Sequence, residues 1–275
     1  MLRDKLLARI AEMGGTVDHQ RLAAEVLGIR GAPPALAKRL VAQALVVEDR
    51  RDVWRATGER ICRDAPAAPG VYVLKDAEGR ALYVGKAVNL RRRLRAHFAE
   101  RRWRAIKPAL SRAADAEWYP VGSELEALLR EAALIGELQP PVNVQIGAPQ
   151  LDARAIPRAL LLDTVVLVPS VEDDSLEFVA ARVEDSAWMI QRTRRNGADL
   201  AVHSHRLWRF FNSALRHARP SGPPLAPLVY SWLAGRGAAA TRVDPHAACS
   251  AQEMRARLTA LLRDERLFHE RLEQW

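Results

Sequence analysis

The sequence has few of the residues that build disulfide frameworks or structural metal sites. Only two cysteines occur among 275 residues, Cys62 and Cys249, and no Cys or His group has the spacing of zinc or iron–sulfur ligands. No stretch approaches the roughly 18 consecutive apolar residues of a membrane-spanning helix. The N-terminus also lacks an apolar core of signal-peptide length. We therefore expect a soluble, cytoplasmic protein with no membrane partner and no small-molecule cofactor.

Lysine is scarce as well, since only five of the 42 basic residues are lysine. The net charge of +9 and the pI near 10.2 still indicate a polyanionic partner such as DNA. The densest basic cluster comprises Arg91, Arg92, Arg93, Arg95, Arg101, Arg102, Arg104 and Lys107. This cluster predicts a phosphate-contacting surface. The alternative is a solvated helix face in an arginine-rich protein.

The first third of the chain has a helical pattern. Helices are expected over about 2–13, 18–27 and 34–45, and Val46-Val47 and Val53-Trp54 then bracket a charged turn. Three helices and a short hairpin predict a winged-helix-like domain over residues 1–63. Lys38 and Arg39 on the third helix are its candidate DNA contacts. The alternative is a small helical domain that positions a neighbour or docks a partner.

Proline-containing segments divide the rest of the chain. A Pro/Ala linker ends at Pro69, and a second boundary falls near Gly147-Ala148-Pro149, which gives domains 69–147 and 150–275. In the last domain an apolar run at 159–168 precedes strand patterns at 176–182 and 186–193. Helical patterns follow at about 203–217, 225–234 and 251–272. The fold class is therefore α+β, and no catalytic motif is evident after residue 150.

Two short apolar segments of the central domain predict an antiparallel hairpin. Gly70-Val71-Tyr72 and Tyr83-Val84-Gly85 flank the turn signal Asp76-Ala77-Glu78-Gly79. If the hairpin folds symmetrically about Ala77 and Glu78, Tyr72 lies directly opposite Tyr83. A loop of three or five residues would break that pairing. The symmetric register would place two phenols side by side on one face.

A helix that begins after Ser123 places one acid in an unusual position. Ser123 as N-cap and Glu126 at the third position form a capping box. Glu126, Arg130 and Glu137 cluster on one side, whereas Glu131 falls inside the wide apolar arc. A buried carboxylate needs a compensating cation or hydrogen bonds. The candidates are one Mg²⁺ or Mn²⁺ ion held by this single carboxylate, or a salt bridge to Arg93.

The helix after Lys86 places two further polar side chains along one edge. Leu90, Leu94 and Phe98 mark its buried stripe, while Arg93 and His97 are four residues apart. These two side chains can face the hairpin phenols, and the neighbouring arginines then point toward a phosphate backbone. The alternative for Arg93 is an ordinary surface arginine.

The same segments resemble the two signature tripeptides of the GIY-YIG nuclease superfamily. Residues 69–144 are most similar to the N-terminal endonuclease module of the C component of bacterial excinuclease ABC and its Cho-type relatives. The resemblance implies a metal-dependent DNA endonuclease with Mg²⁺ or Mn²⁺ as cofactor. The positions that match the family's site are Tyr72, Tyr83, Lys86, Arg93, His97, Glu131 and Asn143. Damaged or branched DNA is the implied substrate, and a repair protein is a possible partner.

These residues predict hydrolysis of a phosphodiester around one ion. Glu131 holds the metal, Arg93 neutralises charge on the phosphate, and a phenolate takes the proton of the attacking water. Tyr83 is slightly preferred over Tyr72 as that base because Lys86 is near it in sequence. Asn143 has two equal interpretations, a brace of the site or a purely structural residue.

Two other functions stay open at this stage. One is a structure-specific DNA-binding or scaffold protein that does not cut. The other is a mobile-element or restriction-type nuclease, which would require a sequence-reading domain. The complete set of site residues argues against the first function, and the weak basic character of residues 34–45 gives the second little support.

Overall fold

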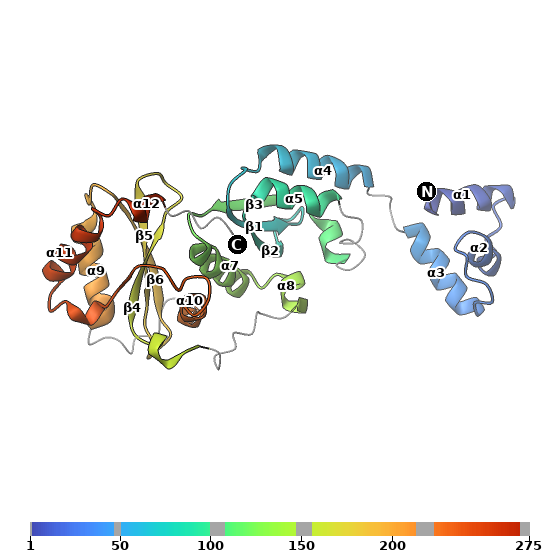
Figure 1. The fold of residues 1–275 in the computed structure, drawn as a ribbon. Helices are drawn as coiled ribbons and strands as arrows, with labels where there is room; N and C mark the ends of the chain where they lie inside the picture. Colours follow the sequence, from blue (N-terminus) through green and yellow to red (C-terminus); the bar gives the residue numbers. More distant parts are fainter. Residues whose placement is uncertain (1, 47–50, 100–107, 147–155, 213–222, 270–275) are drawn as a thin grey trace. The chain divides into compact units, whose positions relative to one another are not determined.

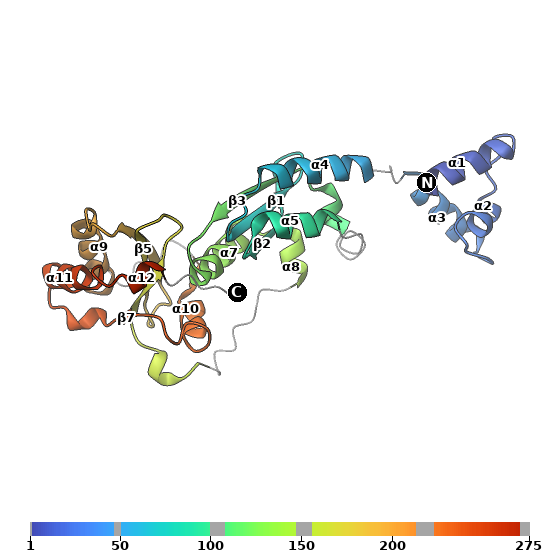
Figure 2. The same ribbon diagram turned by 45° about the horizontal axis from the view of Figure 1, so that its top comes forward.

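The computed structural model describes residues 2–46, 51–99, 108–146, 156–212 and 223–269. The backbone forms two compact units, Met1–Ala56 and Thr57–Trp275 (Figures 1 and 2). The finer division of the second unit near residues 147–150 stays a prediction, since that segment lies outside the described residues. Within the described ranges, no helix combines the length and the apolar character needed to cross a membrane.

The first unit is helical, as the sequence predicts. Its helices are α1 (Leu2–Glu12), α2 (His19–Glu25) and α3 (Pro34–Val46). The side chain of Asp18 caps α2 by accepting a hydrogen bond from the backbone N–H of Arg21. The core of this unit consists of the buried side chains Leu6, Leu22, Ala23, Ala32, Ala37 and Val41.

The hairpin predicted after the third helix is wrong. Val53 and Trp54 lie in helix α4 (Arg51–Asp64), so they form no strand. Trp54, Ile61 and Ala65 are buried, which is the spacing of a helix face rather than of a strand. The winged-helix outline for residues 1–63 therefore lacks its wing, and residues 47–50 lie outside the described part.

The second unit begins with an antiparallel sheet. Its strands are β1 (Gly70–Lys75), β2 (Ala81–Ala87) and β3 (Asp115–Pro120), in the order β2-β1-β3. The hairpin is confirmed, whereas β3 is a strand that the sequence analysis misses. Strand β1 is paired along both edges, and Val71 and Tyr72, which point to its opposite faces, are each fully buried.

The hairpin register differs from the symmetric prediction. Tyr72 pairs with Gly85, and Tyr83 pairs with Leu74. The turn closes between Asp76 and Arg80 around a three-residue loop that ends at Gly79, whose φ of 79° suits glycine. An irregularity between Leu74 and Lys75 then shifts the pairing once more. The shift places the two tyrosines diagonally, two residues apart but still on the same face.

Helices α5 (Leu90–Ala99), α7 (Glu124–Leu138) and α8 (Pro141–Ile146) accompany this sheet, with a 3₁₀ turn at Pro108–Arg112. The predicted cap of α7 is confirmed, because the Ser123 hydroxyl accepts a hydrogen bond from the backbone N–H of Glu126.

A second antiparallel sheet follows, with the strand order β6-β5-β4-β7. Its strands are β4 (Thr164–Pro169), β5 (Ser175–Ala181), β6 (Trp188–Arg194) and the short β7 (Arg242–Val243). We call these four strands the C-terminal sheet. The apolar run and the two strand patterns predicted for this region are thereby confirmed.

The helices that follow β6 are α9 (Leu200–Asn212), α10 (Ala226–Leu233), α11 (Ala251–Leu261) and α12 (Arg266–His269). Short 3₁₀ turns lie at Arg158–Leu160 and Pro245–Ala247. The single helix predicted over 251–272 is wrong, because α11 and α12 are separate. The part of the predicted helix 203–217 beyond residue 212 lies outside the described residues.

Both faces of the C-terminal sheet are covered, with α9 and α11 on one side and α10 on the other (Figures 1 and 2). One face buries Phe178 against Phe211 and Met254, and the opposite face buries Val179 against Trp232. The second face also receives the first half of α7. The helix that follows the first sheet is thus part of the core of the second sheet.

Candidate active site

The two hairpin tyrosines form the centre of the site. Their ring centroids are 5.9 Å apart, and the rings are tilted by 54°. Tyr72 is fully buried, whereas Tyr83 is partly exposed. A Cβ on Gly85, the strand partner of Tyr72, would lie 2.8 Å from both the Tyr72 hydroxyl and the Tyr83 ring. Glycine at this position therefore lets the phenols lie across the strand.

Helix α5 contributes His97, which packs against both phenol rings. The His97 ring centroid lies 5.5 Å from that of Tyr72 and 6.1 Å from that of Tyr83. His97 is 3% exposed, and its Nε2 shares a hydrogen bond with the Tyr72 hydroxyl. This contact ties the first hairpin strand to α5 and keeps the Tyr72 oxygen inside the protein.

Arg93, one turn before His97, is exposed but reaches both phenols. Its charge and its side-chain interaction with each phenol act to lower the pKa of Tyr72 and of Tyr83. Arg93 therefore lies against the tyrosine pair, as predicted from its place on α5. The alternative of an isolated surface arginine does not fit these contacts.

Glu131 on α7 faces Lys86 at the end of β2. The Lys86 Nζ lies 3.3 Å from the Glu131 Oε2, and the two side chains are 28% and 21% exposed. The ion pair of this carboxylate is thus with Lys86, whereas the sequence alternative was a salt bridge to Arg93. The negative charge of Glu131 also helps raise the pKa of Tyr83, which puts the acid close to that phenol.

The environment favours the protonated form of both phenols. Burial raises the pKa of Tyr72 well above its ordinary value, and the neighbouring Tyr83 adds to this effect. Burial is also the main cause of the raised pKa of Tyr83, followed by the charge of Glu131. Extra positive charge is needed before either phenol can act as a base at neutral pH.

Asn143 binds the backbone of β2 next to Tyr83. Its Oδ1 accepts a hydrogen bond from the Val84 N–H at 2.8 Å, and its Nδ2 donates to the Val84 carbonyl at 2.9 Å. The side-chain amide thereby pairs with the strand as a neighbouring strand would. Since Val84 follows Tyr83 directly, this clamp holds the strand that presents the phenol.

A hollow of about 320 Å³ lies beside Lys86. Its lining includes the cationic side chains of Lys86, Arg92 and Arg93, together with Asn89. The sequence analysis missed Asn89, whose Oδ1 caps α5 by accepting a hydrogen bond from the backbone N–H of Arg92. An Asn directly before a helical pattern is a cap signal that could have identified it.

The other basic residues predicted to contact DNA lie in different environments. Arg91 donates a hydrogen bond to the Ala65 carbonyl at 2.7 Å, so it also has a structural role. Arg92 and Arg95 are exposed on α5, and Lys38 and Arg39 are exposed on α3 of the first unit. The predicted contacts that lie outside the described residues are Arg101, Arg102, Arg104 and Lys107.

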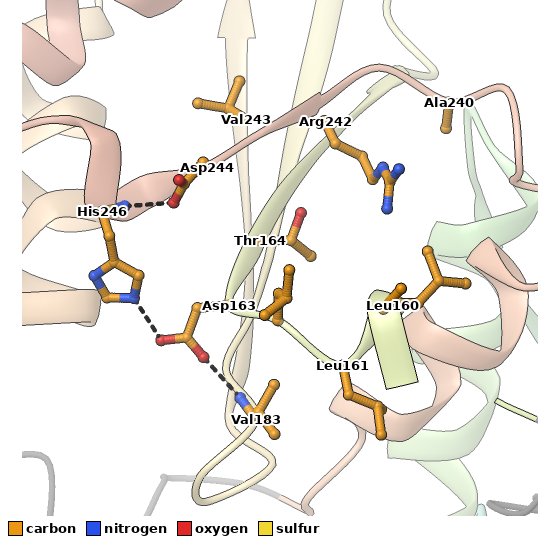
Figure 3. A pocket seen from close by; sticks show the side chains of 12 residues that line it. Leu160, Leu161, Asp163, Thr164, Val183, Ala240, Arg242, Val243, Asp244 and His246 are labelled. Carbon is orange, nitrogen blue, oxygen red and sulfur yellow. Dashed lines mark hydrogen bonds and ion pairs between the residues drawn. The ribbon is translucent and has the colours of Figure 1, made fainter. Parts of the chain in front are cut away.

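A larger hollow, of about 840 Å³, lies at the end of the C-terminal sheet (Figure 3). Its wall includes the pair His246–Asp163, with 2.9 Å between Nε2 and Oδ2. Asp163 also accepts a hydrogen bond from the Val183 N–H, so its carboxylate has two partners. Among the described residues, no group of three or more His, Cys, Asp or Glu side chains could hold a metal.

The site residues from Tyr72 to Asn143 all lie in one part of the chain that a family model matches. The family model described as the UvrC-like GIY-YIG domain matches residues 68–144. This part of the chain is therefore a UvrC-like GIY-YIG domain, as the sequence resemblance predicts. The match covers the hairpin, α5, and the residues Glu131 and Asn143.

Curated relatives are similar to the same part of the chain. The UvrABC system protein C of Syntrophus aciditrophicus is 49% identical over 81 residues, which are 29% of this chain and 13% of that protein. The protein of the same name from Tropheryma whipplei is 45% identical over 84 residues, 30% of this chain and 14% of the relative. The chain thus spans only a small part of the length of these relatives.

Solved structures of one such domain also match. The GIY-YIG N-terminal endonuclease domain of UvrC from Thermotoga maritima, bound to magnesium, is 32% identical. The match covers 31% of this chain and 94% of that one, with a TM-score of 0.28.

Proposed function

We propose that the chain is a metal-dependent endonuclease that hydrolyses phosphodiester bonds in damaged or branched DNA during DNA repair. One observation supports this proposal above the others. Tyr83, Arg93 and Glu131 come from three different elements of a UvrC-like GIY-YIG domain, and the charges of Arg93 and Glu131 both act on the Tyr83 phenol. A base, a phosphate-binding cation and a metal-binding acid are the groups that such hydrolysis requires.

Tyr83 is the proposed general base. Its side chain is partly exposed, so a water molecule can reach the hydroxyl, whereas Tyr72 is fully buried and hydrogen-bonded to His97. Ionising an ordinary tyrosine at pH 7 costs roughly 4 kcal/mol. Burial raises that cost at Tyr83 by raising its pKa, and the charge of Arg93 opposes the increase. The role of Tyr72 is then to orient Tyr83 and Arg93.

Arg93 and Lys86 are the proposed phosphate contacts. Both line the hollow beside β2, where Arg92 adds a third positive charge. Preorganised cations at this place stabilise the charge that grows on the phosphate oxygens during the reaction. Arg92 and Arg95 extend the positive surface along α5 for the neighbouring phosphates.

Glu131 is the residue that would hold a Mg²⁺ or Mn²⁺ ion. Its carboxylate offers oxygen donors and already faces a cation, the ammonium group of Lys86. At 21% exposure it is open to water and to phosphate oxygens, which suits an ion that keeps most of its hydration shell. When bound, the ion supplies Lewis-acid polarisation of the phosphate and stabilises the leaving oxygen.

A cleavage assay with matched helix variants tests the proposal. The full chain is incubated with Mg²⁺ or Mn²⁺ and single-stranded, duplex, nicked, flapped or lesion-bearing DNA. Glu131→Gln is expected to lower the rate by at least about 100-fold. Glu137→Gln removes a carboxylate from the exposed end of the same helix and should keep the wild-type rate.

Two outcomes contradict this assignment in different ways. A wild-type rate in the Glu131→Gln variant would remove the acid from the mechanism. Binding of branched DNA by the wild-type chain without any cutting would favour the non-catalytic DNA-binding function.

A further inference from the structure

Helix α7 packs against both sheets of the second unit. Its later residue Glu131 pairs with Lys86 of the hairpin, whereas Leu125 and Leu129 lie in the apolar core of the C-terminal sheet. In that core they join Val179 of β5 and Trp232 of α10. The C-terminal sheet therefore completes its core with the helix that carries the proposed metal ligand.

The first turn of α7 is also held by polar contacts. Glu124 is 1% exposed, accepts a hydrogen bond from the Trp232 Nε1 at 3.1 Å and pairs with Arg236. An acid in the first turn also suits the helix dipole. Its burial depends on residues more than 100 positions later, so the local sequence carries no signal for it.

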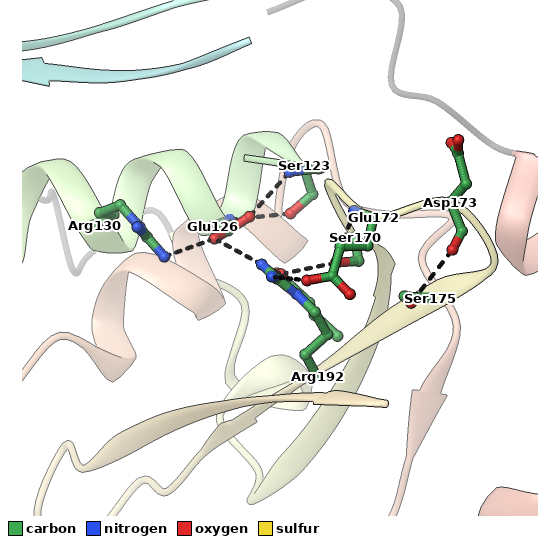
Figure 4. A network of polar contacts seen from close by, with 10 residues as sticks. Ser123, Glu126, Arg130, Ser170, Glu172, Asp173, Ser175 and Arg192 are labelled. Carbon is green, nitrogen blue, oxygen red and sulfur yellow. Dashed lines mark hydrogen bonds and ion pairs between the residues drawn. The ribbon is translucent and has the colours of Figure 1, made fainter. Parts of the chain in front are cut away.

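Glu126 makes the second buried polar contact (Figure 4). The pattern of α7 places this acid opposite the apolar arc, yet it is 1% exposed. Its Oε1 lies 3.0 Å from the Arg130 Nη2 and 3.8 Å from the Arg192 Nη2. Its Oε2 accepts a hydrogen bond from the Gly122 N–H.

Arg192 connects Glu126 to the C-terminal sheet. On β6 it pairs directly across from Glu177 of β5, and its Nη2 lies 2.8 Å from the Glu177 Oε1. The side chains of Glu126 and Glu177 are each 1% exposed, and Arg192 lies between them. Two buried acids that face one guanidinium make Arg192 hard to replace, because its removal leaves buried charge uncompensated.

The backbone before α7 also approaches the backbone after β4 closely. A Cβ on Gly122, which precedes the Ser123 cap, would lie 2.0 Å from the Ser170 carbonyl carbon and 2.4 Å from the Val171 nitrogen. Only a residue without a side chain permits this approach. The start of α7 is therefore packed against the end of β4 both through its backbone and through its side chains.

We propose that Arg192 is a positioning residue of the nuclease: by bridging Glu177 and Glu126 it holds α7, and with it Glu131, in the geometry that the site needs. Glu131 lies five residues after Glu126, about 7.5 Å further along the helix axis. A change in the tilt of the first turn therefore displaces the carboxylate. The effect of Arg192 on cleavage rests on the proposed function, whereas its effect on the position of α7 does not.

Arg192→Met tests the proposal in the full chain, with Arg194→Met as control. Arg194 lies on the same strand and is exposed, so both variants lose one charge from β6. We expect faster amide hydrogen exchange at residues 128–132 in Arg192→Met, and Mn²⁺ binding weakened about 2- to 30-fold. In Arg192→Lys, both the exchange rate and the Mn²⁺ affinity should lie between those of Arg192→Met and the wild type. Lysine keeps the positive charge but lacks the planar set of donors of the guanidinium group.

A second pair of variants keeps the test decisive if Arg192→Met does not fold. Gly122→Ala inserts a methyl group between the two backbones, and Gly136→Ala adds the same group on α7, where the nearest neighbouring atom is 3.8 Å away. Faster exchange at residues 128–132 only in Gly122→Ala supports the coupling. Equal exchange in Gly122→Ala and Gly136→Ala, or in Arg192→Met and Arg194→Met, overturns it.

These measurements separate the inference from the proposed function. Hydrogen exchange on α7 needs neither DNA nor cleavage. A wild-type chain that cuts no DNA refutes the nuclease assignment, and the exchange difference between the matched variants still decides whether Arg192 holds the helix.

Discussion

Tyr72 and Tyr83 lie diagonally across the hairpin, with ring centroids 5.9 Å apart, and only Tyr83 is accessible to water. The shifted register has a chemical consequence. The Tyr72 hydroxyl shares a hydrogen bond with the His97 Nε2, whereas the Tyr83 side chain is partly exposed. The two phenols therefore have different environments, Tyr72 as the last residue of one signature tripeptide and Tyr83 as the first residue of the other.

Replacing each tyrosine by Phe should affect cleavage and stability differently. Tyr83→Phe removes the proposed base and should lower kcat by about 100- to 10,000-fold. Tyr72→Phe removes the hydroxyl that binds His97, so it should mainly lower the free energy of unfolding, by about 1–3 kcal/mol. Steady-state cleavage and urea unfolding of both variants measure the two effects. The reverse ranking of the kcat values would assign the base to Tyr72.

The pH dependence of cleavage provides a second test. A phenol is active as a base when it has lost its proton, and burial together with Glu131 raises the pKa of Tyr83. The rate should therefore rise with pH, about tenfold per unit, from pH 6 into the alkaline range. A rate that reaches its plateau below pH 6 would argue for a carboxylate as the base.

Gly85→Ala tests the close approach of the phenols to β2. The new methyl group would lie 2.8 Å from both tyrosines and displace them. A displacement of about 1 Å in an active site can cost around 100-fold in rate. The control is Gly79→Ala in the hairpin turn, where the φ of 79° makes alanine unfavourable by about 1 kcal/mol without touching the site. Cleavage and thermal unfolding distinguish the two variants.

Glu177→Gln tests the buried acid pair through the pH dependence of stability. Burial and then the charge of Glu126 raise the pKa of Glu177 from 4.5 to about 7, against the opposing effect of Arg192. Between these values the folded state keeps a proton that the unfolded chain has lost, so stability falls as pH rises. Relative to the wild type, the variant should be more stable at pH 8 than at pH 5 by about 2–3 kcal/mol.

The measurement is urea unfolding at both pH values. The charged neighbours of this acid pair are Arg192, which also pairs with Glu172, and Arg130, which pairs with Glu126. The control is Glu172→Gln, an exposed member of the network. If the free energy of unfolding changes equally between pH 5 and pH 8 in the wild type and in Glu177→Gln, Glu177 does not take up the proton.

Local patterns in the sequence predict much of the central domain. The hairpin, the α5 stripe and the Ser123 cap depend on residues within a few positions of one another, and each of them is present. The register is different because loop length and one strand irregularity decide it. A change of one residue in the loop length or in the strand irregularity shifts the cross-strand partner of every residue in the hairpin.

The less predictable features depend on distant segments. Glu126 is polar by every local criterion, but β5 and β6 bury it by packing over the start of α7. Val53 and Trp54 fit a short strand when considered alone, whereas the burial of Ile61 and Ala65 shows a helix. In both cases tertiary packing outweighs the local pattern.

The amide of Asn143 also protects the chain from association with copies of itself. β2 is the outer strand of its sheet, and the unpaired backbone groups of an outer strand can recruit a strand from another molecule. By occupying both groups of Val84, Asn143 closes that edge at its middle. The residue that braces the phenol-bearing strand therefore also limits aggregation through the same two hydrogen bonds.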